Sequence, residues 1–168
     1  LAELPALLLD GPKAVGKTET AKRRAQTVVR LSRERELQLA DAQLDTLLHK
    51  PTSVLFDEWQ RLPEVWEAVK DSADEDRTPS RFLLTGSAPL DDTHSGAGRI
   101  PSVRMRPLTL PERLVCSPTV SLNTLLSGSS PVLEGRSDFT LEDYTDLILR
   151  SGFPGFQDLS SRTLNKQL

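Results

Sequence analysis

A short stretch near the start of the sequence has the residue types that bind phosphate groups. Residues 11–18 read GPKAVGKT and fit the pattern GxxxxGK[ST] at every fixed position. Glycines let consecutive backbone N–H groups turn towards phosphate oxygens, and the N-terminus of a following helix adds its positive end. In this pattern Lys17 reaches the β and γ phosphates of a nucleotide, and the Thr18 hydroxyl is a ligand of Mg²⁺. The predicted nucleotide-binding residues here are Gly11, Pro12, Lys13, Ala14, Val15, Gly16, Lys17, Thr18 and Glu19.

Two acidic residues, Asp57 and Glu58, directly follow the apolar residues 54–56. In an open α/β sheet, ligands bind beside the carboxyl ends of the strands. There Asp57 would hold the Mg²⁺ shell, directly or through water. Glu58 suits a general base that polarises the water attacking the γ-phosphate. The alternative interpretation of Glu58 is a helix N-cap or a surface acid.

Two hydroxyl residues, Thr85 and Ser87, end a third apolar run at residues 82–84. At the carboxyl edge of a sheet either hydroxyl could bond the γ-phosphate or the attacking water, and so sense the state of the nucleotide. Thr85 is predicted to act in catalysis and Ser87 to bind the nucleotide. The other interpretation is a simple turn, because Thr-Gly-Ser is a common turn composition.

Arg99 follows the glycine-rich residues 94–98, which read HSGAG. A guanidinium presented by such a loop could enter a neighbouring chain's site and neutralise charge at its γ-phosphate, which predicts a homo-oligomer. The alternative is a structural arginine, or one that contacts phosphate in a rim with Arg104 and Arg106. His94 is expected to order the loop rather than bind metal, because no second ligand lies at metal-binding spacing. The predicted catalytic residues are thus Lys17, Glu58, Thr85 and Arg99.

The elements that must position these residues are short apolar runs that alternate with helical patterns. Unbroken apolar character is typical of strands buried on both faces of a parallel sheet. Apolar residues at helical spacing form one stripe over residues 37–48 and another over residues 62–69, where Trp66 is interpreted as core. The sequence predicts an α/β fold, a P-loop NTPase with helices on both faces of the sheet. Its predicted strands, about five, cover residues 6–9, 27–31, 53–56, 81–85 and 102–106, the last at an edge.

After Pro107 the pattern becomes helical. Residues 108–115 and 119–126 are predicted to form short helices, followed by a Gly/Ser/Pro loop at 128–135. Thr140 is a predicted N-cap of a last helix that ends near Gly152. The expected buried face of this helix consists of Leu141, Tyr144, Leu147 and Ile148. We expect a core over residues 1–116 and a helical extension over 117–168, the start of an incomplete C-terminal domain.

Composition narrows the class of protein. The chain has 168 residues, a net charge of −3 and one cysteine, Cys116. The acidic balance argues against general nucleic-acid coating, although Arg99, Arg104, Arg106 and Arg113 could form a basic rim. A single cysteine excludes an internal disulfide and fits the cytoplasm, where Cys116 is expected to be a small core residue. No run approaches the ~20 apolar residues of a membrane span, and a first residue other than Met suggests a fragment.

The chain resembles a prokaryotic family of AAA-type P-loop ATPases whose core is followed by a helical domain of unknown function. The resemblance rests on the segments GPKAVGKTETA, LFDEWQRLPEVWEAV, RFLLTGSA, HSGAGRI, RMRPLTLPER and DYTDLILRSGFPGF, in this order. It implies ATP and Mg²⁺ as cofactors, with Thr18 and Asp57 at the metal, Glu58 at the water, and Thr85 and Ser87 as the sensor.

The resemblance favours Mg-dependent ATP hydrolysis coupled to a conformational switch on a protein or nucleic-acid partner. The alternative is a nucleotide-binding interaction module that does not hydrolyse ATP by itself, and this fragment is expected to have weak activity. A small-molecule kinase is disfavoured because Glu58 would have no role and no lid is recognised. A guanine-nucleotide switch is disfavoured because the Asn-Lys pair at 165–166 continues as Gln-Leu rather than supplying the aspartate of a base reader.

Overall fold

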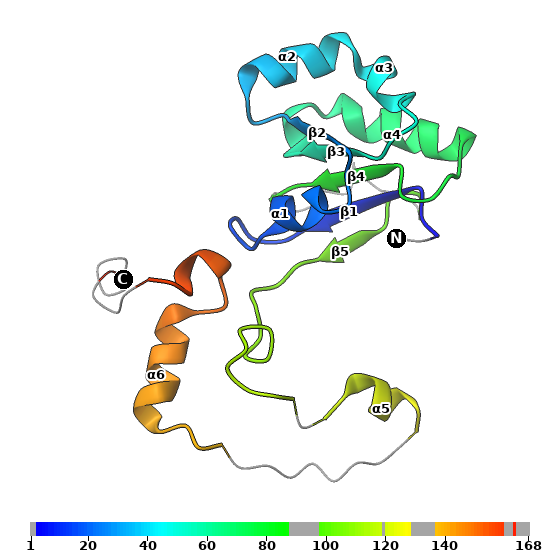
Figure 1. Ribbon diagram of the computed structural model, residues 1–168. Coiled ribbons are helices and arrows are strands. Elements are labelled where there is room, and N and C mark those ends of the chain that lie inside the picture. The colour runs from blue at the N-terminus through cyan, green and yellow to red at the C-terminus, as the bar shows by residue number, and fades with distance from the viewer. Residues whose placement is uncertain (1–2, 88–97, 119, 129–136, 160–162, 164–168) are drawn as a thin grey trace. The chain divides into compact units, whose positions relative to one another are not determined.

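The computed structural model describes residues 3–87, 98–118, 120–128, 137–159 and 163 (Figure 1). The chain divides into two compact units, Leu1–Arg106 and Pro107–Leu168. This division lies earlier than the expected boundary at residue 116, so the first unit ends soon after the last strand. His94 and residues 95–97 lie outside the described residues, as does the loop at 129–135.

The first unit contains a five-stranded parallel sheet in the order β2-β3-β4-β1-β5. The strands are β1 (Ala6–Asp10), β2 (Thr27–Arg30), β3 (Val54–Asp57), β4 (Phe82–Thr85) and β5 (Ser102–Arg104). All five match predicted strands to within two residues at each end, and the last lies at an edge as expected. Because the strands are parallel, the residues that follow β1, β3 and β4 come together at one edge of the sheet.

Both faces of the inner strands β1, β3 and β4 are buried, whereas the edge strand β5 is exposed. Successive residues of the inner strands alternate between the two faces. Leu8, Phe56 and Leu84 pack into the larger hydrophobic cluster, whereas Leu55 and Leu83 pack into the smaller one. This arrangement explains why the strands are apolar without alternation, since each face has its own core. The α/β P-loop fold predicted from the sequence is confirmed.

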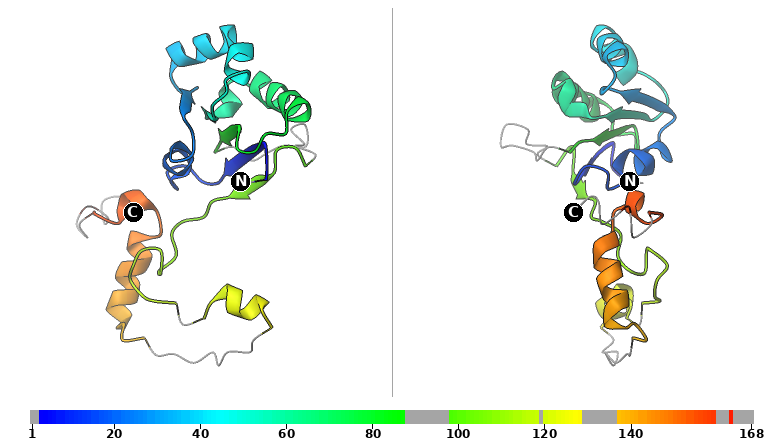
Figure 2. Two further views of the ribbon diagram at one scale, coloured as in Figure 1. Left: turned by 45° about the vertical axis from the view of Figure 1, so that its right-hand side comes forward. Right: turned by 90° about the vertical axis from the view of Figure 1, so that its left-hand side faces the viewer.

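Helices cover the two faces unequally (Figure 2). The helix α1 (Lys17–Lys22) contributes Ala21 to the smaller cluster. On the other face lie α2 (Glu34–Ala42), α3 (Leu44–Leu48) and α4 (Glu64–Glu75), which contribute to the larger cluster. The stripe over residues 37–48 therefore belongs to two helices rather than one, because the backbone leaves helical geometry at Gln43 (φ −130°).

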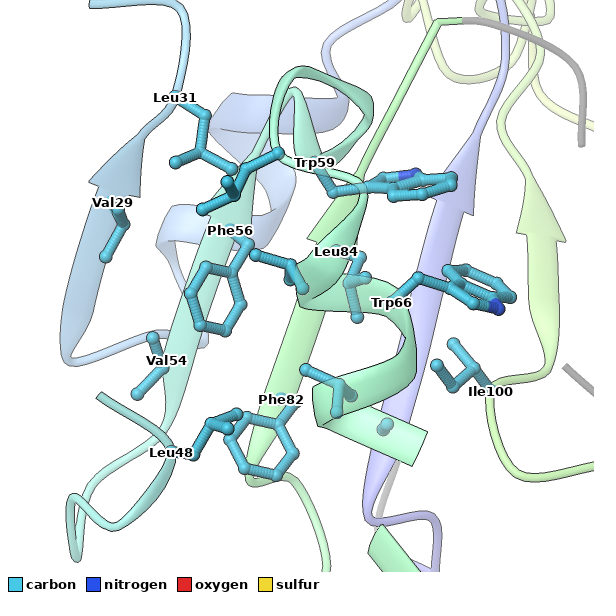
Figure 3. Packing of buried hydrophobic residues seen from close by; sticks show 14 of the residues in the cluster. Val29, Leu31, Leu48, Val54, Phe56, Trp59, Trp66, Phe82, Leu84 and Ile100 are labelled. Carbon is cyan, nitrogen blue, oxygen red and sulfur yellow. The ribbon is translucent and has the colours of Figure 1, made fainter. Parts of the chain in front are cut away.

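Two tryptophans whose rings lie one above the other belong to the larger cluster (Figure 3). Trp66 of α4 is fully buried, and Trp59 lies in a 3-10 helix (Trp59–Arg61) that directly follows β3 and Glu58. Their ring centroids are 4.8 Å apart with the planes tilted by 34°. The core interpretation of Trp66 is confirmed. The acidic pair that precedes Trp59 is thus attached to a rigid part of the molecule.

The second unit contains α5 (Leu122–Leu126) and α6 (Leu141–Arg150). Thr140 caps α6 as predicted, in a capping box with Asp143. The buried face expected for α6 was wrong, because Leu141 and Ile148 are 84% and 76% exposed. Cys116 is also exposed rather than part of a core.

The helix predicted over residues 108–115 does not form. The segment makes a turn in which the Arg113 and Leu114 amides donate to Thr109 and Pro111. Pro111 lacks a backbone donor, and Leu114 has a positive φ of 58°, so a regular helix is interrupted at both places. In the described part of the chain no helix is long and apolar enough to cross a membrane.

Candidate functional site

The GPKAVGKT loop connects the end of β1 to the start of α1, so the sheet edge and the helix N-terminus meet at this loop. Lys17 is the first helical residue and is 5% exposed. Its Nζ atom donates to the carbonyl oxygens of Gly11 and Pro12, at 2.7 and 2.9 Å, and to Ser87 Oγ at 3.2 Å. The ammonium group is therefore held in the mouth of the loop, where an anion with better acceptors could replace the loop carbonyls.

Gly11 is packed against the backbone of Met105, the residue that directly follows β5. Its φ is +141°, and a Cβ atom built on it would lie 2.3 Å from the carbonyl oxygen of Met105. The Met105 amide in turn donates to the Asp10 carbonyl at 2.7 Å. Backbone atoms of two segments therefore approach so closely that the position requires glycine.

Gly11→Ala is expected to destabilise the first unit by about 1–3 kcal/mol, because it adds both backbone strain and a clash with a carbonyl that cannot rotate away. Gly98→Ala is the matched control: its φ is +79°, but nothing lies within 4 Å of the added Cβ. Denaturant unfolding of both variants separates the two costs. Equal losses of stability in the two variants would show that the clash with Met105 adds nothing to the destabilisation.

Asp57 ends β3 and is 6% exposed. Its Oδ1 atom accepts from Thr18 Oγ1 at 2.6 Å and from Thr85 Oγ1 at 2.7 Å. A carboxylate beside a hydroxyl is a donor set suited to Mg²⁺, which completes its octahedron with phosphate oxygens and water. Among the described residues no group of three or more His, Cys, Asp or Glu side chains could hold a metal without such additional ligands.

Glu58 leaves β3 in the left-handed backbone region, with φ 61° and ψ 50°. Its Oε2 atom accepts from the Gln60 amide, and its Oε1 atom accepts from Ser87 Oγ at 3.4 Å. The Glu58 amide donates to Thr85 Oγ1, also at 3.4 Å. Its side chain caps no helix, and a non-glycine residue in this region is typical of functional sites.

The two hydroxyl residues at the end of β4 lie in different surroundings. Thr85 is 1% exposed and donates to Asp57, so it supports the carboxylate from inside the protein. Ser87 instead bonds both Lys17 and Glu58. The structure thus joins Lys17, Ser87 and Glu58 in one chain of hydrogen bonds, and Thr18, Asp57 and Thr85 in another.

The other predicted loop residues take less direct positions. Val15 is buried, whereas Lys13 and Ala14 are exposed. Pro12 has no N–H to offer a phosphate and contributes its carbonyl to Lys17. The side chain of Glu19 points to solvent and pairs with Lys22, which leaves only its backbone to face the site.

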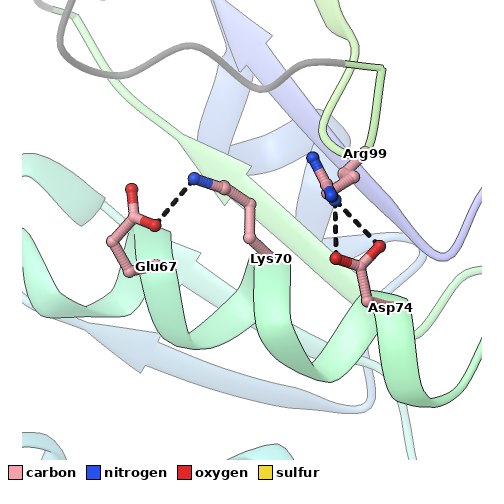
Figure 4. A network of polar contacts seen from close by, with 4 residues as sticks. All are labelled: Glu67, Lys70, Asp74 and Arg99. Atoms are coloured by element: carbon pink, nitrogen blue, oxygen red, sulfur yellow. Dashed lines mark hydrogen bonds and ion pairs between the residues drawn. The ribbon is translucent and has the colours of Figure 1, made fainter.

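Arg99 lies away from this site and is tied to α4 (Figure 4). Its Nε atom contacts both carboxylate oxygens of Asp74, at 2.8 and 2.6 Å, and this partner raises the pKa of the guanidinium further. The next residue, Ile100, is buried in the core. Arg99 precedes β5, which runs parallel to β1, so it lies at the edge of the sheet opposite the phosphate-binding loop of its own chain.

The remaining arginines of the predicted basic rim are partly engaged within the chain. Arg104 donates to Asp10 at 3.2 Å. Arg113 donates to the Gln157 side chain and to the Leu147 carbonyl within the second unit. Arg106 is exposed at the end of the first unit. These contacts give the arginines structural roles that need no nucleic acid.

Comparison with known proteins decides the family. A family model described as "AAA domain" matches residues 3–114, which include the loop, both acidic residues, the β4 hydroxyls and Arg99. The chain belongs to this AAA domain family. It is therefore a P-loop domain of a nucleotide-binding ATPase family, as the resemblance implied.

The relatives of this AAA domain include an uncharacterized protein of Mycobacterium bovis and one of Mycobacterium tuberculosis. Each is 30% identical over 147 residues, which is 82% of this chain and 33% of the relative. The chain thus spans about a third of the length of these curated relatives. The solved structure of PCH-2 from C. elegans aligns with 94% of this chain and 52% of its own, with 16% identity and a TM-score of 0.41.

Three contacts of this AAA domain were not predicted from the sequence. They are the Gln60 bond to Glu58, the Asp74 pair with Arg99 and the Asp10 pair with Arg104. The Gln60 contact depends on the left-handed conformation of Glu58 and the 3-10 turn after it, which the sequence pattern does not indicate. Asp74 and Asp10 carried no signal either, since their partners are far away in the sequence.

Proposed function

We propose that this AAA domain binds and hydrolyses ATP in a Mg²⁺-dependent manner. The observation that supports the proposal is that Glu58, Ser87 and Lys17 form one hydrogen-bonded chain beside the Thr18–Asp57 pair. A phosphate ligand, a metal ligand set and a candidate base are thereby adjacent at the carboxyl edge of the sheet. Ligands of open α/β sheets bind at this edge.

Each residue has a distinct role in the proposed reaction. The loop amides and Lys17 hold the phosphates, and Lys17 exchanges its carbonyl partners for phosphate oxygens. Thr18 and Asp57 hold the metal, which when bound offsets charge on the phosphates, while Thr85 fixes Asp57. Glu58 orients the attacking water and accepts its proton. Ser87, which contacts both Lys17 and Glu58, fits the role of sensor more directly than Thr85 does.

Phosphate release from ATP by the full-length protein, measured with and without Mg²⁺, tests this function. Turnover that requires Mg²⁺ and disappears in Glu58→Gln supports it. Calorimetry on the same protein addresses the second candidate, the binding module. Mg·ATP binding without turnover over a wide range of protein concentrations would favour the module and contradict hydrolysis.

A further part of the proposal is that Arg99 acts in trans, in a homo-oligomer. Arg99 lies at the opposite edge of the sheet and therefore cannot reach the nucleotide site of its own chain. Asp74 engages only the Nε atom of its guanidinium group. The remaining guanidinium N–H groups could therefore contact the nucleotide of a second chain. The ion pair with Asp74 would fix the direction in which they point.

Arg99→Ala is expected to lower specific activity about tenfold at high protein concentration, because one charge-stabilising contact is lost. At low concentration, where chains are separate, the variant and the wild type should be alike. Specific activity measured over a concentration series checks this. An Arg99→Ala defect that does not vary with concentration would indicate a structural role through Asp74.

The partner that the proposed switch acts on is a protein or a nucleic acid. The acidic net charge and the arginine contacts within the chain favour a protein. Binding of the full-length protein to DNA with a steep salt dependence would instead support a basic rim.

A further inference from the structure

We propose that Gln60 is a positioning residue for Glu58. Its side-chain amide holds one oxygen of the Glu58 carboxylate and leaves the other directed to the nucleotide site. The inference rests on the hydrolysis proposed above. It assigns a role to a residue that the sequence pattern left without one.

The two oxygens of Glu58 have different partners. Gln60 Nε2 donates to Oε2 in a short bond. Within the part of the chain that the structure describes, Oε1 has only the long 3.4 Å contact from Ser87 Oγ, which itself lies 3.2 Å from Lys17 Nζ. Because Lys17 marks the phosphate side, Oε1 is the oxygen available to a water near the γ-phosphate. The short bond to Oε2 fixes the orientation of the whole carboxylate.

The backbone brings Gln60 over Glu58. Glu58 adopts the left-handed conformation, and the 3-10 helix that follows is closed by the Arg61 amide donating to the Glu58 carbonyl at 3.0 Å. This turn places the side chain of residue 60 beside that of residue 58. Trp59 between them is buried on Trp66, so the turn is attached to the core.

Packing holds the amide of Gln60 in place. Its Oε1 atom is buried and has no hydrogen-bond partner among the described residues, an arrangement that is unfavourable by itself. That oxygen lies 3.0 Å from where a Cβ atom on Gly86 would be, and Trp59 Nε1 lies at 2.9 Å. Because Gly86 has no side chain, the side-chain amide of Gln60 fits between Gly86 and its other neighbours.

A neutral amide suits this position. Gln60 donates a hydrogen bond without bringing a positive charge, so the carboxylate keeps its ability to accept a proton from water. A lysine or arginine here would form an ion pair with Glu58 and compete with that water.

Turnover by the wild type, Gln60→Ala, Glu58→Gln and the double variant tests the proposal. Gln60→Ala should lower kcat about tenfold or more because the base is misplaced, with KM for ATP within about twofold because the phosphate contacts remain. In the Glu58→Gln background the second substitution should change nothing. An equal loss in both backgrounds, or an unchanged or raised kcat in Gln60→Ala, would overturn the proposal.

Two further variants separate positioning from damage to the fold. Gly86→Ala should reproduce the kcat loss, because the added methyl group would lie 2.9 Å from Trp59 Nε1 and 3.0 Å from Gln60 Oε1 and so displace the turn that carries Gln60. A melting temperature close to that of the wild type shows that the displacement of Trp59 leaves the fold intact. Gln38→Ala is the matched control, since it removes a glutamine-to-glutamate bond of 3.1 Å on the exposed face of α2. Its kcat and its melting temperature should remain at wild-type values.

A measurement that needs no turnover distinguishes failure of this inference from failure of the proposed function. The side-chain ¹³C resonance of the Glu58 carboxylate, identified by its loss in Glu58→Gln, should shift in Gln60→Ala and Gly86→Ala but not in Gln38→Ala. A resonance that stays in place in Gln60→Ala overturns the role of Gln60. If the resonance shifts in Gln60→Ala but the wild-type protein shows no ATP turnover, the contact between Gln60 and Glu58 is supported and the proposed hydrolysis is rejected.

Discussion

Glu58→Gln is expected to lower ATP turnover about 1,000-fold, because the amide cannot accept a proton from the attacking water. The substitution keeps the size of the side chain and its place after β3. The contacts of Lys17 and Thr18, which bind phosphate and metal in the proposed site, are not made by Glu58. The affinity for Mg·ATP should therefore stay within about threefold of the wild type.

Single-turnover hydrolysis and calorimetry, carried out on the same preparation, check this pair of outcomes. Glu64→Gln, at the exposed start of α4, is the control for removal of one acidic charge. If Glu58→Gln hydrolyses ATP at the wild-type rate, Glu58 is not the base. Loss of both binding and turnover would mean that the residue supports the loop rather than the chemistry.

Lys17→Ala should weaken Mg·ATP binding about 100-fold, because a buried ammonium that bonds phosphate oxygens is worth several charge-assisted hydrogen bonds. The wild-type side chain is already confined to the loop by three acceptors. Little further ordering is therefore needed when the phosphates arrive, which concentrates the binding energy in this residue. Turnover should disappear with binding.

Thermal unfolding with and without Mg·ATP gives the cleanest readout, since a ligand that binds only the folded state raises the melting temperature. The wild type should show this rise and Lys17→Ala should not. Lys70→Ala, which removes a surface ion pair with Glu67 on α4, should respond to Mg·ATP like the wild type. A normal rise in Lys17→Ala would place the phosphates elsewhere.

The sheet and the phosphate-binding loop could be predicted because their signals are local. Strands buried on both faces are continuous apolar runs, and a loop that wraps phosphate needs fixed residues at fixed spacing. Asp57 and Glu58 followed from the rule that the carboxyl ends of parallel strands share an edge. These features depend on neighbours in the sequence or on one topological rule.

The contacts missed by prediction depend on residues that the chain brings together from a distance. The glycine-rich residues before Arg99 are typical of a loop that presents an exposed arginine. Its partner Asp74 nevertheless lies on a helix 25 residues earlier in the sequence. The division of the apolar stripe at Gln43 is decided by packing rather than by helix propensity. For α6, periodicity identified which face is apolar but carries no information about whether anything covers it.

The close approach of Gly11 and Met105 joins the two ends of the first unit's functional segment. Met105 is the penultimate residue of the first unit, and the second begins at Pro107. The backbone that leaves the first unit thus runs directly against Gly11, the first residue of the GPKAVGKT loop. Any movement of Gly11 towards this segment would meet the carbonyl oxygen of Met105, one residue before the first unit ends.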